Sequence, residues 1–584
     1  MVASSFPPLP AFLQAAKQQV ISRARRDRDG AFWSLPPKYR PNAETFESSL
    51  GFGSAGVLLS LLEVYRCEPD TETESLLADG AAWLAAQLKK RGFQHGFYAG
   101  STGVWFTLAR LESHLPGVSS DWREIMNDQI ASLSLGDTPA GLVNGAAGSL
   151  LGMLLMGTGD EQSPAEETLT QCLLASTKLH SDGVFWDFSP TSLRPPIGFL
   201  PGNCGIEYAL AALKECRRQT VTEILTGSLQ YTDSLFDASN QNWLDYDSAT
   251  TIKTLDQEAL ATRVQKGKFS QGRKCTSPED SISWGSGTCG ILLTRAFMRK
   301  CYADHRVGDL ANDDCRRAIN RLEQVSAEEL HQLDSSVLHG LPGVILALEE
   351  ISPYLTESEI AVTSALAIRS RQILETRPME VTGEDVSLFS GIAGLMHTLL
   401  PESENDRLVP IVSPLAGNLN PATDAAKEET SIDLTPFIDR RLPLAKSTAK
   451  LSPRELPASV TLQSVREVIV QRTANMTAGE KRAVEYELSI HQSLSEASFQ
   501  DLFWRELECQ MRFSRFYDEG MDDLLLLERF QLSHTVSLLR LDFDPHSGSV
   551  RATEASNLVV RYTTSRGVIE VKISELQLAL LQEF

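Results

Sequence analysis

The stretch VLHGLPGVILALEEI at residues 337–351 combines a histidine, two glycines three positions apart and an apolar run. The first glycine permits a turn that other residues resist. The second falls in the first turn of the helix that the apolar run predicts, where the lack of a side chain lets another backbone or a ligand approach closely. Because the run is apolar on most faces, we expect a buried helix.

The same element occurs seven times along the chain, in most cases at intervals of about fifty residues, which indicates one repeated structural unit. Each copy has two glycines three positions apart followed by an apolar helix. The glycine pairs are Gly53/Gly56, Gly100/Gly103, Gly145/Gly148, Gly202/Gly205, Gly287/Gly290, Gly340/Gly343 and Gly391/Gly394.

More polar segments lie between these copies, for example at residues 71–92 and 357–377. They carry Glu and Lys on one predicted helix face and Leu, Ala and Ile on the other, as half-exposed helices do. The alternation predicts a mainly α protein, an α/α toroid with seven GxxG-opened inner helices and a layer of outer helices. The glycine turns then gather at one end of the barrel and line a pocket.

We assign residues 1–401 to this toroid, with a polar insert at 242–283 as a loop at its rim. Residues 402–457 are dense in Pro, Ser, Thr and charge and predict a linker, partly disordered. Residues 458–584 predict a small C-terminal α+β domain, with three period-two strands and a short final helix. Two roles are compatible with this domain: docking or dimerisation, and recognition of a peptide.

The seven GxxG-opened helix pairs resemble the lanthionine synthetase C-like (LanC-like) peptide cyclases over about 360 residues. The resemblance implies an α/α toroid that adds cysteine thiols of a precursor peptide to dehydrated Ser and Thr residues. It also implies a zinc ion held by the Cys of a W-C-x-G motif and by the Cys and His of a C-H-G motif, which would lower the pKa of a thiol.

This chain departs from the zinc motifs. The motif stretch SWGSGTCG keeps Trp284 but places Gly285 at the first cysteine position, and VLHG keeps His339 but places Leu338 at the second. Two further polar positions of the family are matched by Pro201 and Gly141. By the family motif we therefore expect no metal ligation, and a peptide cyclase that works without the usual zinc site.

Three roles are open for His339: a lone metal ligand, an acid or base for a thiol, and a structural residue at a helix start. An ordinary imidazole titrates near pH ~6.5, which suits removal of a thiol proton. We take His339 and His180 as candidate catalytic residues. His180 lies beside Ser181 and Asp182 in a predicted loop, where histidines are commonly just solvated.

Candidate substrate-binding residues lie at the predicted turns. Trp284 either packs at the barrel mouth or stacks on a peptide, and Gly287, Gly202 and Gly340 line the expected pocket. Two cysteines occupy the same position of adjacent repeats, just before the second glycine. With His339 they are possible substitute zinc ligands, although buried cysteines in tight turns also pack as small apolar residues. They are Cys204 and Cys289.

Composition narrows the functional class. The formal net charge of −22 and the pI near 5.0 argue against nucleic-acid binding, because neutralising phosphates needs clustered Lys and Arg. We find no apolar stretch of about 18 residues or more, so no membrane span, and no signal-peptide pattern at the N-terminus. The nine cysteines form no CxxC and fit a reduced, cytoplasmic compartment.

Three functions follow as hypotheses. The first is a thioether (lanthionine-type) cyclase acting on a dehydrated ribosomal precursor peptide. The second is a catalytically silent scaffold that binds a precursor peptide or partner enzymes. A kinase motif set is missing from the sequence, so a kinase/lyase or dehydratase partner would have to supply the dehydrated peptide. The third is a carbohydrate-active barrel, which needs paired carboxylates, whereas the turns offer Glu207 alone.

Overall fold

The structure is a computed structural model. It describes residues 10–35, 47–131, 138–156, 163–186, 196–200, 202–243, 281–377, 385–400, 429–496, 536–541, 557–564 and 567–574. Most of the polar insert, residues 244–280, lies outside this part of the chain, as does the final helix expected after residue 574.

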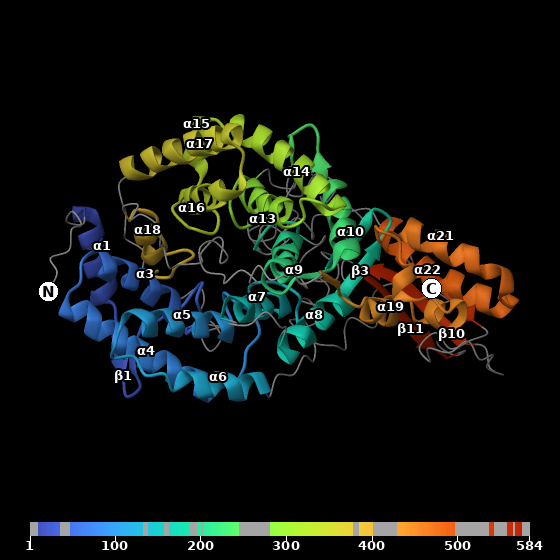
Figure 1. Cartoon of the computed structure of the whole chain (residues 1–584), viewed down its shortest axis with the longest axis horizontal. Helices are drawn as coiled ribbons and strands as arrows, with labels where there is room; N and C mark the ends of the chain where they lie inside the picture. The colour runs from blue at the N-terminus through green and yellow to red at the C-terminus, as the bar shows by residue number, and fades with distance from the viewer. Residues whose placement is uncertain are drawn as a thin grey trace, which may run out of the picture.

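Seven helices form an inner ring, and each begins at the residue after the first glycine of a pair, as predicted (Figure 1). Each inner helix contacts the next one along the chain, and the last contacts the first, so the ring is closed. The inner helices are α3 (Ser54–Cys67), α5 (Ser101–His114), α7 (Ala146–Met156), α9 (Asn203–Arg217), α13 (Thr288–Cys301), α16 (Leu341–Ile351) and α18 (Ile392–Thr398).

A second layer of helices packs around this ring. The outer helices α8 and α17 begin with capping boxes, Ser163 with Glu166 and Thr356 with Glu359, which satisfy backbone N–H groups at the helix start. The outer layer consists of α1 (Ala11–Ser22), α4 (Thr71–Arg91), α6 (Trp122–Ala131), α8 (Pro164–Ser176), α10 (Thr222–Asp233), α14 (Arg306–Glu323) and α17 (Glu357–Thr376). The sequence therefore predicted the α/α toroid correctly.

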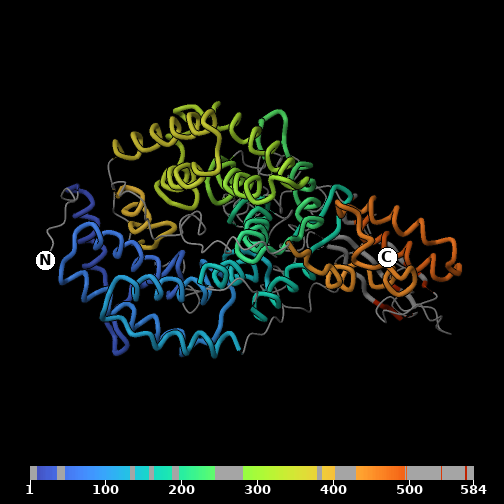
Figure 2. Tube along the Cα trace, in the orientation of Figure 1, coloured from blue at the N-terminus to red at the C-terminus, as the bar shows by residue number. Residues whose placement is uncertain are grey.

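The N-terminal helix α1 takes the seventh outer position, because it contacts both α18 and α3 where the ring closes. In Figure 2 this blue helix lies beside the golden α18. The segment that follows is tied to the ring through Trp33, whose indole N–H donates to the carbonyl of Val20 at 2.8 Å. The backbone N–H of Trp33 donates to the hydroxyl of Ser54, the first residue of α3.

Short elements complete the toroid. Three antiparallel hairpins each follow an outer helix: β1 (Arg25–Asp27) with β2 (Gly30–Phe32), β3 (Thr177–His180) with β4 (Gly183–Trp186), and β6 (Phe236–Asp237) with β7 (Asn242–Trp243). A short helix and a 3-10 turn flank α16, namely α15 (Ala327–Gln332) and η3 (Ser352–Tyr354).

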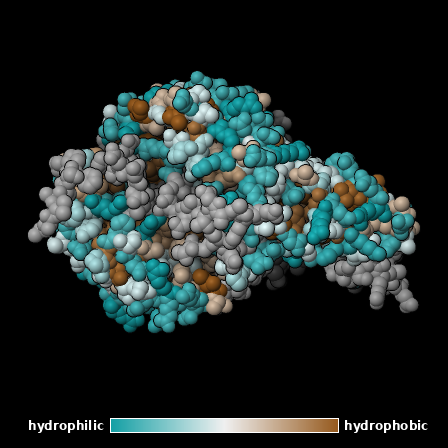
Figure 3. Space-filling model, in the orientation of Figure 1, coloured by the Kyte–Doolittle hydropathy of each residue, from teal (hydrophilic) through white to brown (hydrophobic). Residues whose placement is uncertain are grey.

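One continuous apolar core fills the ring between the two helix layers. On the face shown in Figure 3, hydrophobic residues occur in small groups among hydrophilic ones. The residue three positions before each first glycine is apolar and at most 3% exposed in all seven repeats; these residues are Leu50, Phe97, Leu142, Phe199, Trp284, Val337 and Leu388. The helices of the described part include none long and apolar enough to cross a membrane.

The C-terminal unit combines helices with a three-stranded antiparallel sheet of order β11-β10-β9. The three strands fall where the sequence predicted them. The elements are β8 (Thr430–Ser431), α19 (Thr435–Arg441), α20 (Pro443–Ala449), η4 (Pro453–Glu455), α21 (Leu462–Arg472), η5 (Thr473–Asn475), α22 (Ala478–Glu496), β9 (Val536–Leu541), β10 (Asn557–Thr564) and β11 (Gly567–Ile573).

The segment expected to be a linker differs from that expectation. Its described part, residues 429–457, contains β8, α19 and α20 rather than an extended connection. β8 pairs in parallel with β5 (Gln219–Thr220) of the toroid, and the side chains of Phe437 and Ile438 belong to the toroid core. Pro436 and Pro443 lie at the starts of α19 and α20, where proline is well tolerated, so a composition typical of linkers also suits short helices.

Candidate functional site

The seven turns that open the inner helices share one backbone hydrogen bond. In every repeat the N–H of the residue after the first glycine donates to the carbonyl seven positions earlier, at 2.8 to 3.1 Å. The second glycine packs against the same loop. A Cβ there would lie 1.8 to 2.4 Å from the carbonyl oxygen six residues earlier, so glycine is required at each of the seven positions.

Hydrogen bonds between repeats draw these turns together at one end of the ring. The residue two positions before each first glycine lies at the junction. Gly51 N–H donates to Tyr98 O at 2.8 Å, and Phe389 N–H donates to Gly51 O at 2.9 Å. Leu338 N–H donates to Phe389 O at 3.2 Å, and Gly285 N–H donates to Leu338 O at 3.0 Å. The predicted gathering of the turns is therefore present, and we call this arrangement the turn ring.

A further regularity escaped our sequence prediction, which aligned the repeats on their glycine pairs alone. The residue four positions before the first glycine is serine in four repeats and glycine in three, namely Ser49, Ser283, Ser336 and Ser387, and Gly96, Gly141 and Gly198. Each serine hydroxyl accepts the N–H of the residue before the first glycine, at 3.1 to 3.4 Å. Gly141 stands where the family has a polar residue. In this chain it shares its position in the repeat with Gly96 and Gly198, so a glycine there is not peculiar to the third repeat.

His339 directly precedes Gly340, the N-cap of α16, and its side chain is exposed at the turn ring. Its backbone N–H donates to the hydroxyl of Ser336 at 3.1 Å. Other repeats carry Phe52, Ala99, Asn144, Ser286 and Ser390 at the same position, so this turn does not need an imidazole to form. The turn itself therefore gives no reason for a histidine at this position, and the catalytic role of His339 stays a prediction.

The residues at the family's zinc positions do not fit a zinc ion. Gly285 has no side chain to offer, and a Cβ at this position would lie 2.7 Å from the carbonyl oxygen of Leu338 and 2.8 Å from Leu338 Cδ1. Zinc sites take about three protein ligands from Cys, His, Asp or Glu. Of the three family positions, His339 alone carries such a side chain.

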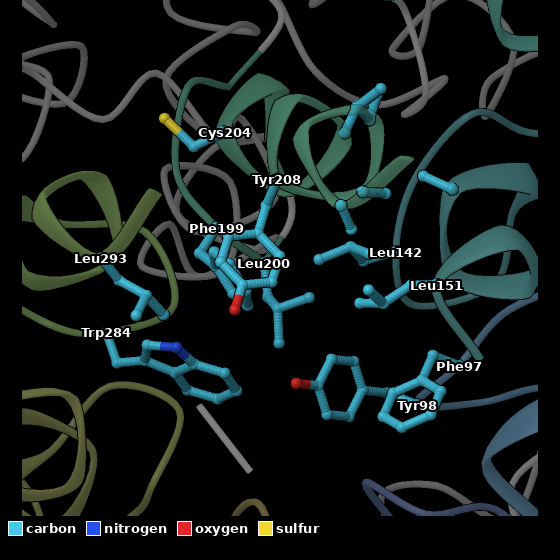
Figure 4. Close-up of a cluster of buried hydrophobic side chains, with 14 of the residues drawn as sticks. Phe97, Tyr98, Leu142, Leu151, Phe199, Leu200, Cys204, Tyr208, Trp284 and Leu293 are labelled. Atoms are coloured by element: carbon cyan, nitrogen blue, oxygen red, sulfur yellow. The ribbon is translucent and has the colours of Figure 1, made fainter. Parts of the chain in front are cut away.

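The two cysteines considered as substitute ligands are fully buried at the starts of their helices. Burial raises the pKa of both thiols, that of Cys289 to about 12. In Figure 4 the sulfur of Cys204 points away from Trp284 and Tyr98. Within the described stretches of the chain, His, Cys, Asp and Glu form no group of three that could hold a metal ion.

Trp284 lies in an aromatic cluster inside the turn ring rather than on its surface (Figure 4). Its ring centroid is 5.6 Å from those of Phe199 and Phe389 and 6.0 Å from that of Tyr98. Because the side chain is 0% exposed, no ring face is open to a peptide in this conformation. Its predicted role in substrate binding stays untested, and its packing role is evident.

The three glycines predicted to bind substrate are the N-caps of their helices. A Cβ would meet a carbonyl oxygen of the same turn at 1.8 Å for Gly202, 2.4 Å for Gly287 and 2.2 Å for Gly340. This close packing is enough to explain why glycine occurs at these three positions, and no bound ligand is needed for that explanation. Contact with a peptide stays a prediction for them. Pro201, just before Gly202, lies outside the described residues.

His180 ends β3 and lies on the side of the toroid that faces the C-terminal unit. Its Nδ1 is 3.3 Å from a carboxylate oxygen of Asp182, and its ring packs edge-on against Tyr231 with centroids 5.2 Å apart. The neighbouring Ser181 N–H donates to the hydroxyl of Ser495 in α22. His180 thus lies between its own hairpin and the outer helix α10, while its neighbour Ser181 contacts the C-terminal unit.

Glu207, the carboxylate that the sequence placed just inside the fourth inner helix, is buried in an ion pair with Arg295, and its other oxygen accepts the hydroxyl of Ser228 at 2.5 Å. Both charged side chains are 0% exposed. A glycosidase acid must reach its substrate together with a second carboxylate. The buried Glu207 therefore does not supply the accessible carboxylate that the carbohydrate-active hypothesis took from the sequence.

A closed ring of GxxG-opened helices inside a ring of outer helices defines an α/α toroid with its helix starts at one end. The model of the family described as "Lanthionine synthetase C-like protein" matches residues 44–412. This is more than half of the chain, and the chain belongs to the LanC-like family. The match covers all seven turns and ends before the C-terminal unit.

Among solved structures, a chain described as "Nisin cyclase" is similar, with 16% sequence identity and a TM-score of 0.45. The alignment covers 67% of this chain and 94% of that chain. The curated proteins contain no match. Family membership therefore rests on the sequence match over the toroid.

Proposed function

We propose that this protein is a peptide-modification protein, a thioether cyclase that acts on a dehydrated ribosomal precursor peptide without the usual zinc site. Membership of the LanC-like family supports the class of reaction. The observation that carries the proposal is the position of His339. This exposed imidazole lies at the turn ring, at the position of the family's histidine ligand. The positions of the family's two cysteine ligands hold Gly285 and Leu338, which offer no metal-binding side chain.

In the proposed reaction a thiol of the peptide adds across the carbon–carbon double bond of a dehydrated Ser or Thr. The bond between sulfur and the β-carbon forms, the thiol proton passes to the imidazole of His339, and solvent delivers a proton to the α-carbon. The reaction is an addition, so no oxidant or reductant is required. A neutral imidazole is a suitable base near physiological pH.

The proposal includes a partner and a location. A kinase/lyase or dehydratase protein would produce the dehydrated peptide, since this sequence carries no kinase motifs. The cysteines within the described residues form no disulfide with one another, which is compatible with a reducing compartment such as the cytoplasm. His180, the second candidate, lies beside Asp182 and packs against Tyr231 of α10, and the proposed mechanism assigns no step to it.

The test is thiol loss from a dehydrated, cysteine-containing precursor, followed by thiol labelling and mass spectrometry. Unmodified protein should accelerate thiol loss over the buffer control, and His339→Ala should slow it by about 10²-fold or more, the usual contribution of a general base. His331→Ala, which removes an exposed histidine from α15, is the matched control and should leave the rate unchanged. If thiol loss is no faster than in buffer, the protein is not a cyclase for that peptide.

The alternative is a catalytically silent scaffold that holds the precursor for partner enzymes. The filled interior favours it, because Tyr98, Trp284 and Phe389 are each at most 1% exposed and pack against one another inside the turn ring. A scaffold would bind the precursor, measured by fluorescence anisotropy, without changing the rate of thiol loss. The same two measurements on His339→Ala separate the hypotheses, since only a cyclase loses rate while keeping affinity.

A further inference from the structure

The junction between the fifth and sixth repeats is where the family would bind its metal, and here it is closed by the protein itself. Gly285 N–H donates to Leu338 O at 3.0 Å, and Leu200 N–H continues the ring by donating to Gly285 O at 2.6 Å. The Leu338 side chain is half-buried and lies over the α-carbon of Gly285, with Cδ1 2.8 Å from where a Cβ would stand. The space of a residue-285 side chain is therefore already occupied.

The same arrangement occurs at a second junction of the turn ring. Among the seven residues two positions before a first glycine, glycine occurs at Gly51 and Gly285 only. At Gly51 the ring of Phe389 takes the place of the missing side chain, 2.7 Å from a would-be Cβ. Both glycines are thus covered by the residue at the same position of the adjacent repeat. The repetition indicates a packing rule of this ring and not an isolated loss of a ligand.

We propose that Gly285 and Leu338 form an interlocked pair that holds the fifth and sixth repeats together where a metal ion would otherwise bridge them. The two departures from the family's motif are then one coupled change: the glycine admits the leucine, and the leucine fills the space. The protein folds and keeps its turn ring with no zinc. This inference rests on family membership and on the packing, and it stands or falls independently of the proposed cyclase activity.

The first test measures metal and stability on the full chain, purified without chelator or immobilised nickel. Elemental analysis should find less than about 0.1 zinc per chain, far below the one ion of a structural or catalytic site. Addition of 1,10-phenanthroline should leave the thermal unfolding midpoint unchanged. The proposal would be overturned if the unmodified protein held about one zinc per chain and His339→Ala lost it. This holds whatever the stability of the Gly285 and Leu338 variants.

The second test is a double-mutant cycle. Gly285→Ala should lower the unfolding midpoint by more than about 4 °C, because its Cβ meets both a carbonyl oxygen and Leu338 Cδ1. Leu338→Ala should lower it less. The double variant should lose less than the sum of the two, since removing Cδ1 relieves part of the crowding.

Gly479→Ala is the matched control, because nothing lies within 4 Å of a Cβ at that position. It should leave the midpoint unchanged or raise it slightly, as Ala does inside a helix. A Gly285→Ala variant as stable as this control, or strictly additive losses, would refute the interlock. Should Gly285→Ala yield no folded protein, the zinc content of the unmodified chain and the response to chelator still decide.

Discussion

Arg295 on α13 and Glu207 on α9 form an ion pair in which both side chains are fully buried. The same guanidinium donates through Nε to Asp314 of α14 at 2.8 Å. These contacts join the fourth repeat to the fifth, the two repeats that are separated by the longest interval in the sequence. A buried charge network therefore braces the junction where the chain connection is longest.

We predict that Arg295→Met destabilises the toroid by about 3–5 kcal/mol, because Glu207 is left buried without its cation and Asp314 keeps only the more distant Arg317, at 3.7 Å. The measurement is denaturant-induced unfolding followed by circular dichroism. Arg316→Met is the control, since Arg316 and Asp313 form an exposed pair, which contributes less than about 1 kcal/mol. Equal losses in the two variants would mean that the buried network does not brace the junction.

The C-terminal unit should respond to pH through two buried groups on α22. The carboxylate of Glu487 accepts the N–H groups of Leu444 and Ala445 at the start of α20, and burial raises its pKa to about 7. One turn later, His491 Nε2–H donates to the carbonyl of Arg441, and burial lowers the pKa of this imidazole to about 4.

The two shifts have opposite signs. A raised carboxyl pKa gives stability that is present at low pH and lost as pH rises from about 4.5 to about 7. A lowered histidine pKa gives stability that is present above about 6.5 and lost as pH falls towards about 4. Between about pH 4.5 and 6.5 the two slopes oppose each other, each on the order of 1.4 kcal/mol per pH unit.

We therefore predict a nearly flat pH dependence of C-terminal unfolding between about pH 4.5 and 6.5 in the unmodified protein. His491→Gln should uncover the Glu487 slope, so that the unfolding free energy falls steadily as pH rises. Glu487→Gln should uncover the opposite slope. Unfolding can be followed by amide exchange of α20 and α22, corrected for the intrinsic pH dependence. Parallel curves for all three proteins would contradict the assignment.

Docking of the C-terminal unit should depend on Arg441. Its guanidinium donates to the carbonyls of Ser176, at 3.0 Å, and Thr177, at the point where α8 ends. A cation is favourable at a helix C-terminus and satisfies carbonyls that lack helical partners. Arg441→Ala should therefore loosen the unit and speed cleavage between it and the toroid in limited proteolysis. Arg440→Ala removes an exposed neighbouring cation and should not, so equal cleavage of both variants would argue against this contact.

The proposed mechanism also predicts a pH–rate profile. If His339 removes the thiol proton, the rate of thiol addition should rise with pH and then level once the imidazole is neutral, because only the neutral imidazole can accept a proton. In His339→Ala the rate should instead climb with the thiolate fraction towards about pH 8.5, the ordinary thiol pKa. Stopped-time thiol assays from pH 5 to about 9 give both curves. Identical profiles would exclude His339 as the base.

The sequence predicted the ring because its signal is local and repeated. Seven glycine pairs each fix a turn through contacts within seven residues of chain, so the position of every inner helix could be read from the sequence. It also located the three C-terminal strands from their period-two pattern. It failed at residues 429–457, where proline and polar residues suggested a linker, because the packing of α19 onto the toroid depends on contacts far away in the chain.

The candidate site was less predictable. His339 could be placed at the turn ring from its repeat alone, but His180 could not be placed, since its neighbours Tyr231 and α22 come from other parts of the chain. Trp284 could be placed at a turn, whereas its burial depends on Phe199, Phe389 and Tyr98 from three other repeats. Distant partners leave no pattern in one sequence.

By itself, the sequence determined the seven-fold repeat, the helix starts and the loss of two metal-ligand side chains. Each of these depends on residue identity at a fixed spacing. The tertiary structure alone decided which group fills the vacated space, because Gly285 and Leu338 are far apart in the chain and meet through the hydrogen bond that joins their repeats. Local backbone geometry depends on residues close together in the sequence, so a short pattern predicts it. Which side chain fills a space between two repeats depends on how the closed ring brings those repeats together.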